Sequence, residues 1–543
     1  MRAHLHAIIL VGELRPGMQV ACRWPLKMGE PVRASSPVRS TMGFPLLSFT
    51  AYPLLHACCS PPLCMLRRSR SSVSFLAVLF TAVSVLAQDN QYWTQQHGAH
   101  AQLMGGAMIA GTDDQSVLFY NPAAMAFVKS NGITASTSFI YYQKLSMKDV
   151  SGYGLSSSDA SADNSPRLVA GAFDAGPRWR ISLGFVSAVY SGFEMDAANS
   201  VELDAYPNVA GSVVLRGLTN NSTEVRDDQI GLGASYALSE RSAIGATLFG
   251  SSFVQRFAYV NNVSIFPGPS SSDPATTLAD LGSVQRGEVE NLGFVLKLGY
   301  LHRNEGVQWG ASVALPRWST HFWEGSMYRS ATGRSVNGAV ISDLYYSEEL
   351  ATRYHTPWML DAGLQVQRGR TLLAVRFCYS TAVEAYDRMT LTQADAVYPA
   401  SAEGDEPVLR VRSANRSLVN GAVGATYRLS DKADVIAGLR SDLNYFDQQA
   451  LDRPMDVSGT LSFWDLYHAS AGVDLHSERV KLTAGLVYAF GSDTGTPEQL
   501  LAVDDRVVTS ISTVQFKTGF QQIGFTFGFS YFVLGDRKPA TSK

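Results

Sequence analysis

The chain has 543 residues, a formal net charge of −3 and only 17% charged residues, whereas soluble domains carry about a quarter. No run of about eighteen apolar residues indicates a membrane-spanning helix, and no basic excess indicates nucleic-acid binding. Low charge without such a run fits a transmembrane β-barrel, in which apolar residues are spread along the strands by alternation.

The first 87 residues read as two separate segments. Residues 1–64 are rich in proline, show no period and hold four of the five cysteines; we interpret them as a non-native upstream extension. Residues 65–87 combine a basic start, an apolar run at 73–86 and small residues before a cleavage point after Ala87. This order predicts a secretory signal peptide. Without residues 1–87 the formal charge is about −10.

Residues 88–130 do not alternate and are too few to fold alone. They contain small residues that permit close packing, an acidic pair at 113–114, and an Asn-Pro turn. An Asn before Pro can satisfy backbone groups that the turn leaves unpaired. We predict that this segment is a hatch plugging the lumen of the barrel that follows it. Its candidate residues are Gly105, Gly106, Asp113, Asn121, Pro122 and Ala123.

From residue 131 onward, large apolar residues alternate with small or polar ones, which predicts strands with one apolar face. We expect about fourteen antiparallel strands within a barrel at 131–535, followed by a tail at 536–543. The strands are predicted at 131–144, 167–175, 178–192, 224–238, 242–258, 287–302, 306–319, 352–367, 370–384, 410–429, 432–446, 461–476, 479–490 and 514–534.

Short polar turns and long connections alternate between these strands. Outer-membrane barrels have short turns on the periplasmic side and long loops outside, so both termini should lie on the short-turn side. The predicted external loops are 145–166, 193–223, 259–286, 320–351, 385–409, 447–460 and 491–513.

In its Gly105-Gly106-Ala107 stretch, its acidic pair and its Tyr120-Asn121-Pro122-Ala123 turn, the chain resembles the long-chain fatty-acid and hydrocarbon transporter family of the outer membrane. The resemblance implies a fourteen-stranded barrel with an N-terminal hatch and passive uptake of hydrophobic small molecules. The chain differs from the family at Ala124, where members often have Gly, and in its tail after the last strand.

No enzyme motif is found: the chain lacks H-E-x-x-H, G-x-S-x-G and P-loop patterns. We expect no catalytic residue, no cofactor and no metal. His97 and His100 have a spacing that could hold a metal on a helix, but we interpret them as a solvated linker. His468, Ser470 and Asp474 alternate on one strand face, which predicts a lumen hydrogen-bond network rather than a lipase site. Cys378 is predicted to be a lumen-side filler.

Three functions remain open for such a barrel. The first is a channel for fatty acids or aromatic hydrocarbons, whose partners are the hydrophobic ligand and the lipid and lipopolysaccharide of a Gram-negative outer membrane. The second is a porin for polar solutes, and the third is a subunit or adaptor of a protein-export system. The sequence leaves the oligomeric state open, with a monomer as our working expectation.

The predicted loop 320–351 is rich in aromatics, and exposed apolar clusters commonly mark binding surfaces. The alternative is that Phe322 and Trp323 extend the aromatic girdle of the membrane interface. The candidate ligand-capture residues are Phe322, Trp323, Met327, Tyr328, Tyr345 and Tyr346.

Overall fold

The computed structural model describes residues 90–533, all within the unit Ala77–Lys543. The residues not described inside this range are 94, 129–130, 149–155, 204–209, 270–276, 335–337, 339, 399–403, 448, 450–455, 458, 460–463 and 496–515. The predicted upstream extension, signal peptide and C-terminal tail lie outside the described residues, as do the first two residues of the predicted hatch.

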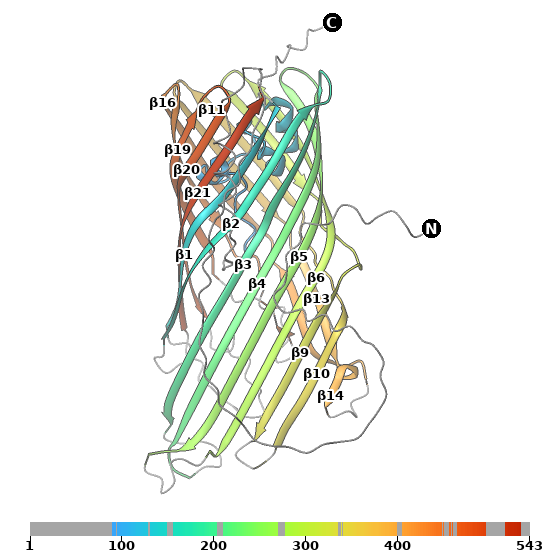
Figure 1. Ribbon diagram of the computed structural model, residues 1–543, viewed down its shortest axis with the longest axis vertical. Coiled ribbons are helices and arrows are strands. Elements are labelled where there is room, and N and C mark those ends of the chain that lie inside the picture. Colours follow the sequence, from blue (N-terminus) through green and yellow to red (C-terminus); the bar gives the residue numbers. More distant parts are fainter. Residues whose placement is uncertain are drawn as a thin grey trace, which may run out of the picture. The chain divides into compact units, whose positions relative to one another are not determined.

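Fourteen strands of the described chain pair into one closed antiparallel ring, in which the last strand returns to the first. The predicted count of fourteen and the barrel fold are confirmed, and Figure 1 shows the tilted strands of the wall. In ring order they are β1 (Asn131–Lys148), β2 (Ser156–Asp174), β3 (Trp179–Leu203), β4 (Val213–Ala237), β5 (Ser242–Pro267), β6 (Ala279–Asn304), β7 (Val307–Ala314), β11 (Met359–Arg368), β12 (Thr371–Ser380), β16 (Leu418–Ser430), β17 (Ala433–Asp442), β19 (Leu466–His476), β20 (Val480–Gly495) and β21 (Phe516–Val533).

The ring turns its large apolar residues outward and its small and polar residues inward. On β17, Leu439 is 57% exposed while its neighbour Arg440 is 4% exposed. On β21, Phe525 and Phe529 are exposed while Thr526 between them is buried. A soluble barrel would need the opposite arrangement, so an apolar solvent must surround this wall.

Strand length differs around the ring. A tilted strand crosses a bilayer in about 9–11 residues, and β11, β12 and β17 have 10 residues each. By contrast, β3 to β6 have 25 or 26 residues. The prediction that residues 193–223 and 259–286 form loops is therefore wrong over most of their length. The strands continue with charged outward residues, such as Arg256 between Glu224 and Glu288, so apolar alternation ends before the sheet does.

The predicted loop 320–351 is also mostly strand. Pro316 follows β7, and because proline cannot donate to a ladder it interrupts the pairing. Pairing with β6 then resumes through β8 (Trp318–Ser319) and β9 (Glu324–Arg334), and β10 (Val340–Ala351) pairs with β9. The segment is a hairpin that prolongs the tall side of the wall, as Figure 1 shows.

The predicted loop 385–409 and the start of the predicted strand 410–429 form a second sheet. It consists of β13 (Val383–Thr392), β15 (Pro407–Asn415) and β18 (Asp456–Val457). A short helix, η2 (Gln393–Asp395), leads into β14 (Ala396–Tyr398), which pairs with β10. The prediction of one continuous strand was wrong because β15 pairs with β13 and not with the ring.

Before β1, the chain forms α1 (Ala99–Leu103), α2 (Val117–Tyr120) and the 3-10 helix η1 (Pro122–Phe127). None of the helices in the described part of the chain is long and apolar enough to cross a membrane. These three helices contact the inner faces of ring strands on both sides of the lumen, α1 against β17, β19, β20 and β21 and η1 against β3 to β6.

Candidate functional site

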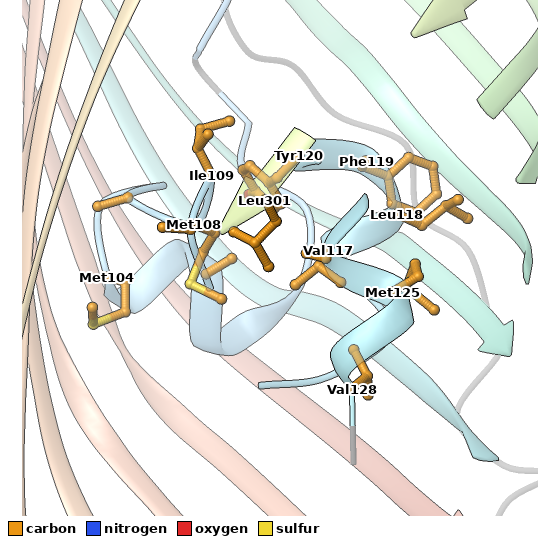
Figure 2. Packing of buried hydrophobic residues seen from close by; sticks show 14 of the residues in the cluster. Met104, Met108, Ile109, Val117, Leu118, Phe119, Tyr120, Met125, Val128 and Leu301 are labelled. Carbon is orange, nitrogen blue, oxygen red and sulfur yellow. The ribbon is translucent and has the colours of Figure 1, made fainter. Parts of the chain in front are cut away.

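The lumen contains two apolar clusters, one near the short turns and one near the long connections. The turn-side cluster joins residues 93–128, here called the N-terminal segment, to inward residues of the ring such as Ala172, Ala243, Leu301 and Ile436. Figure 2 shows Met104, Met108 and Ile109 of this cluster on the left and Leu118, Phe119 and Met125 on the right. All of these side chains are almost completely buried.

Asn121 fixes the turn at the centre of this cluster. Its side chain is fully buried and accepts a hydrogen bond from the backbone N–H of Ala123 at 3.1 Å, which caps η1. Its amide donates to the carbonyl of Ile109 at 2.8 Å and to that of Tyr300 on β6 at 3.0 Å. One side chain therefore joins two parts of the N-terminal segment to the barrel wall.

Gly105 and Gly106 both have positive φ, of 65° and 86°, where residues with a Cβ are strained. A Cβ on Gly105 would also lie 2.9 Å from the carbonyl oxygen of Leu439 on β17. Of the acidic pair, Asp114 is buried and accepts from the N–H of Ser116, whereas Asp113 is partly exposed. The predicted Gly-Gly and Asn-Pro positions thus contact the wall, and Asp113 lies at the partly exposed edge of the N-terminal segment.

A belt of glycines on the inner wall receives the N-terminal segment. A Cβ atom built on any of them would lie within 3.0 Å of that segment, so each site needs the absence of a side chain. Sequence reasoning missed the belt, although inward glycines recurring from strand to strand were a visible signal. Eleven ring strands contribute one each: Gly184, Gly233, Gly245, Gly299, Gly310, Gly363, Gly424, Gly438, Gly472, Gly485 and Gly528.

Buried ionic groups hold α1 against β19 and β20. His100 is bound to Asp474 at 2.7 Å, and Asp474 also pairs with Lys481 at 3.0 Å. Burial and Lys481 lower the pKa of His100, but the carboxylates of Asp474 and Asp113 outweigh them and the pKa is raised. The interpretation of His100 as a solvated linker residue was wrong. Among the described residues, no cluster of three or more potential ligands suits a metal.

Two further inward charges anchor the segment elsewhere. Lys297 of β6 donates to the carbonyl of Phe119 at 2.8 Å, and Arg376 of β12 donates to that of Gly106 at 3.3 Å. Arg376 pairs with Asp361 at 2.7 Å. Charged residues at inward positions of otherwise small-residue strands were the sequence signal for these anchors.

The lumen-face predictions for β19 and β12 agree with the structure. His468 and Ser470 are buried; His468 contacts Arg440, and Ser470 donates to the carbonyl of Leu103. Cys378 is also buried and belongs to the turn-side cluster.

The loop-side cluster combines residues of the wall with residues of the second sheet of β13, β15 and β18, here called the inner sheet. Its members include Phe253, Phe257 and Val289 of the wall and Leu409 and Val411 of β15. Trp464 stacks on Phe520 in the same cluster at 5.8 Å between ring centroids. This is the largest apolar cluster of the lumen outside the N-terminal segment in the described chain.

The six predicted capture residues do not form one surface. Met327 and Tyr345 are buried in the loop-side cluster, whereas Phe322 is 78% exposed. Tyr328 and Tyr346 lie opposite each other on β9 and β10, and Tyr346 is exposed. Trp323 is exposed as well. Alternation along β9 and β10 buries Met327 and Tyr345 and exposes Tyr346, whereas Phe322 and Trp323 precede the hairpin.

The wall is weakly joined between β2 and β3. In the described residues their pairing covers only Leu168–Asp174 with Arg180–Val186, although both strands continue. A register irregularity follows on β3 between Ser187 and Val189. Beside it, the side chain of Gln95 donates to the carbonyl of Tyr190 at 2.6 Å. The N-terminal segment thus touches the wall where its ladder is interrupted.

A closed antiparallel ring with an apolar outer face and an occupied lumen defines the class of transmembrane β-barrels that hold an internal segment. No protein-family model and no curated protein matches the sequence.

Solved structures do match. The Pseudomonas putida toluene transporter TodX superimposes with a TM-score of 0.52 at 13% identity, covering 82% of this chain and 100% of TodX. A Pseudomonas aeruginosa FadL homologue gives 0.51 at 11% identity, covering 81% and 99%. The predicted resemblance is confirmed at the level of the fold.

Proposed function

We propose that this protein is an outer-membrane channel of a Gram-negative bacterium for passive uptake of hydrophobic small molecules, either fatty acids or aromatic hydrocarbons. The observation that carries the proposal is the loop-side cluster, a buried apolar environment inside the barrel that the N-terminal segment does not fill. The shared fold with TodX, a toluene transporter, supports it. Lipid and lipopolysaccharide surround the barrel in this proposal.

Residues 88–130 act in this proposal as the hatch that separates the lumen from the short-turn side. Tight seating on the glycine belt and bonds to β6, β12 and β19 support this role. The weak joint between β2 and β3 offers an apolar ligand a lateral path into the bilayer that avoids the hatch. A porin for polar solutes would need an open aqueous lumen, which this packing opposes.

Two measurements test the proposal. Mass spectrometry of apolar molecules that co-purify with the protein, compared with an unrelated barrel from the same membrane, should show enrichment of one ligand class. Cells lacking the protein should take up that class more slowly. A stable protein partner in a native pull-down, with no apolar ligand enriched, would favour the export role instead.

The hatch is tested by deleting residues 92–128 while keeping the signal peptide. Conductance in planar bilayers should rise, and cells should become sensitive to large polar antibiotics. If neither changes, these residues do not close the lumen.

Two exposed members of the aromatic set, Phe322 and Trp323, which directly precede β9, are proposed as a capture surface. Replacing both with Ser should slow uptake at low ligand concentration and leave assembly unchanged. Reduced assembly with normal uptake per assembled barrel would assign them to the aromatic girdle instead.

A further inference from the structure

The outer face of the wall carries a groove where the last strand of the ring meets the first. Its volume is about 570 Å³, and it lies over β19, β20, β21 and β1 near their long-connection ends. Figure 1 shows these strands side by side. A volume of this size suits a small ligand or part of a larger one. The lining residues that matter most are Lys144, Tyr467, Tyr488, Phe490, Gly519 and Gln521.

A row of small residues forms the floor of the groove. Gly519 of β21 lies opposite Ser492 of β20 and Ser146 of β1. Apart from its chain neighbours, a Cβ atom on Gly519 would have only the Ser146 hydroxyl of the described chain within 4 Å, at 3.1 Å. The next row toward the turns carries larger side chains, because Phe490 and Lys144 lie there on the same two outer strands. The space above Gly519 is therefore open and bounded on its turn side.

The groove is polar toward the long connections and apolar toward the middle of the wall. Along the outward row of β21, Lys517 and Gln521 come first, at the long-connection end. Ile523 and Phe525 follow toward the middle of the strand, and both are exposed. A lipid of the outer leaflet has the same order, with its headgroup outside and its acyl chains below. The groove thus matches such a lipid along the membrane normal.

Three aromatic rings lie at the boundary between the polar and the apolar zone. Tyr467 of β19 lies opposite Phe490 of β20, with 6.0 Å between the ring centroids, and Tyr488 stacks on Phe490 at 5.6 Å. All three side chains are exposed on the outer face. Aromatic residues in this arrangement mark the membrane–water interface. The groove therefore lies at the depth where lipid headgroups join their acyl chains.

The cations at the groove are not neutralised by the described part of the chain. Lys144 lines the groove, Lys517 lies two residues before Gly519 on the same strand, and both are exposed. No carboxylate of the described residues forms an ion pair with either lysine. The carboxylate that lines the groove, Asp465, pairs with Arg416 at 3.5 Å instead. The local excess of charge is positive and suits a ligand with several anionic groups.

We propose that this groove binds the lipid A part of lipopolysaccharide, a glycolipid that carries two phosphates and several acyl chains. Lys144 and Lys517 bind the phosphates, since exposed cations at a membrane surface attract anionic headgroups. One acyl chain packs along Tyr488 and Phe490, which removes apolar surface from water. The inference rests on the outer-membrane location in the proposed function and not on solute uptake.

The bound lipid would contact β1, β20 and β21 together and so link the two ends of the barrel sheet. A ligand that binds only the folded state stabilises that state in proportion to the logarithm of its concentration. Lipid A should therefore raise the melting temperature of the barrel.

Native mass spectrometry of the full barrel in a non-ionic detergent tests the proposal, with purified bisphosphorylated lipid A as the probe. The parent should bind one molecule at low concentration and melt at a higher temperature when it is bound. Monophosphorylated lipid A and phosphatidylglycerol should each bind about fivefold more weakly or worse, because each has one phosphate instead of two.

The double variant Lys144→Gln with Lys517→Gln removes both cations at exposed positions, so assembly should not change. It should weaken the binding of lipid A about 30-fold, at roughly fivefold for each lysine. Raising the ionic strength from about 0.1 M to about 1 M should weaken binding in the parent and have little effect in the double variant. The matched control Lys432→Gln, exposed in the turn before β17, should bind like the parent.

A second variant, Gly519→Leu, fills the groove and keeps both lysines. It should weaken the binding of lipid A at least about tenfold, because the acyl chain loses its place. Its matched control is Gly250→Leu on β5, where a Cβ atom has no neighbour closer than 4.0 Å. Heat-modifiable gel mobility shows that each variant assembles.

Four results would overturn the proposal. Binding that survives both the lysine changes and Gly519→Leu would show a general lipid annulus and no site. Equal competition by inorganic phosphate would assign the lysines to free anions, and equal binding of phosphatidylglycerol would assign the groove to any anionic lipid. A dimer of barrels without bound lipid would assign the groove to a second copy of the chain. None of these results contradicts hydrophobic uptake, which is measured separately.

Discussion

Replacing Asn121 with Leu should unseat the N-terminal segment without unfolding the barrel. Leu has nearly the same shape as Asn, so the change removes three hydrogen bonds and adds little strain. The carbonyl of Ile109 and the N–H of Ala123 lose the partners that Asn121 gives them, and the link to Tyr300 of β6 is lost too. The ring keeps its own ladder, which Asn121 does not join.

The size of the effect follows from the groups left unpaired. An unsatisfied buried backbone group costs about 1–3 kcal/mol, so two groups within the segment give about 2–4 kcal/mol when partial relaxation is allowed. Since 1.4 kcal/mol corresponds to tenfold, the ratio of seated to unseated segment should fall roughly 30- to 700-fold. The unseated form of the segment, which is rare in the parent, therefore becomes measurable in the variant.

Single-channel conductance in planar bilayers measures this population, and sensitivity to a large polar antibiotic measures it in cells. Asn121→Leu should show frequent open events with normal heat-modifiable gel mobility. The control Asn262→Leu, at an exposed position on β5, should behave like the parent. Parental conductance and antibiotic resistance in Asn121→Leu would refute the role of this turn in closure.

Two further predictions concern the seating of the segment. Gly438→Ala should raise leak in the same bilayer assay, because its Cβ would collide with backbone atoms of the segment, whereas Gly421→Ala, with no neighbour closer than 3.7 Å, should not; equal leak from both would argue against the glycine belt. Leak should also depend on pH through His100, whose pKa is raised by Asp474 and Asp113. A raised pKa means that the ion pair contributes fully below the ordinary value of about 6.5 and is lost as the pH rises through the raised value. Conductance measured from pH 5 to 9 should therefore increase with pH in the parent and stay flat in His100→Gln, and the same slope in both would assign the pH dependence to another group.

The ring could be predicted from sequence because a bilayer imposes one rule on every strand that crosses it. Outward residues such as Leu360 and Leu364 must be apolar, and inward ones such as Asp361 and Gln365 need not be. Their exposures follow that rule. Period two therefore identified all fourteen strands before any contact was known.

The same rule explains what could not be predicted. Where β3 to β6 leave the bilayer, water contacts their outer face, and charged pairs such as Arg256 with Glu288 replace the apolar period. The inner sheet was not predicted for a related reason. Because β13 and β15 face other protein rather than lipid, their sequences show no apolar alternation imposed by a bilayer. Asn121 was predictable because its turn chemistry is local, whereas Asp474, the partner of His100, lies far away in sequence.

Buried cations have different kinds of partner in the two halves of the lumen. Near the turns, two inward cations that contact the N-terminal segment meet an oxygen acceptor: Arg376 pairs with Asp361, and Lys297 donates to the carbonyl of Phe119. That pattern is what a structure needs if the segment is to stay in place. Near the long connections, Arg388 meets only neutral groups and aromatic rings. The rings of Phe253 and Tyr354, whose centroids lie 5.5 and 5.4 Å from the guanidinium carbon, compensate part of the cost of burying that charge.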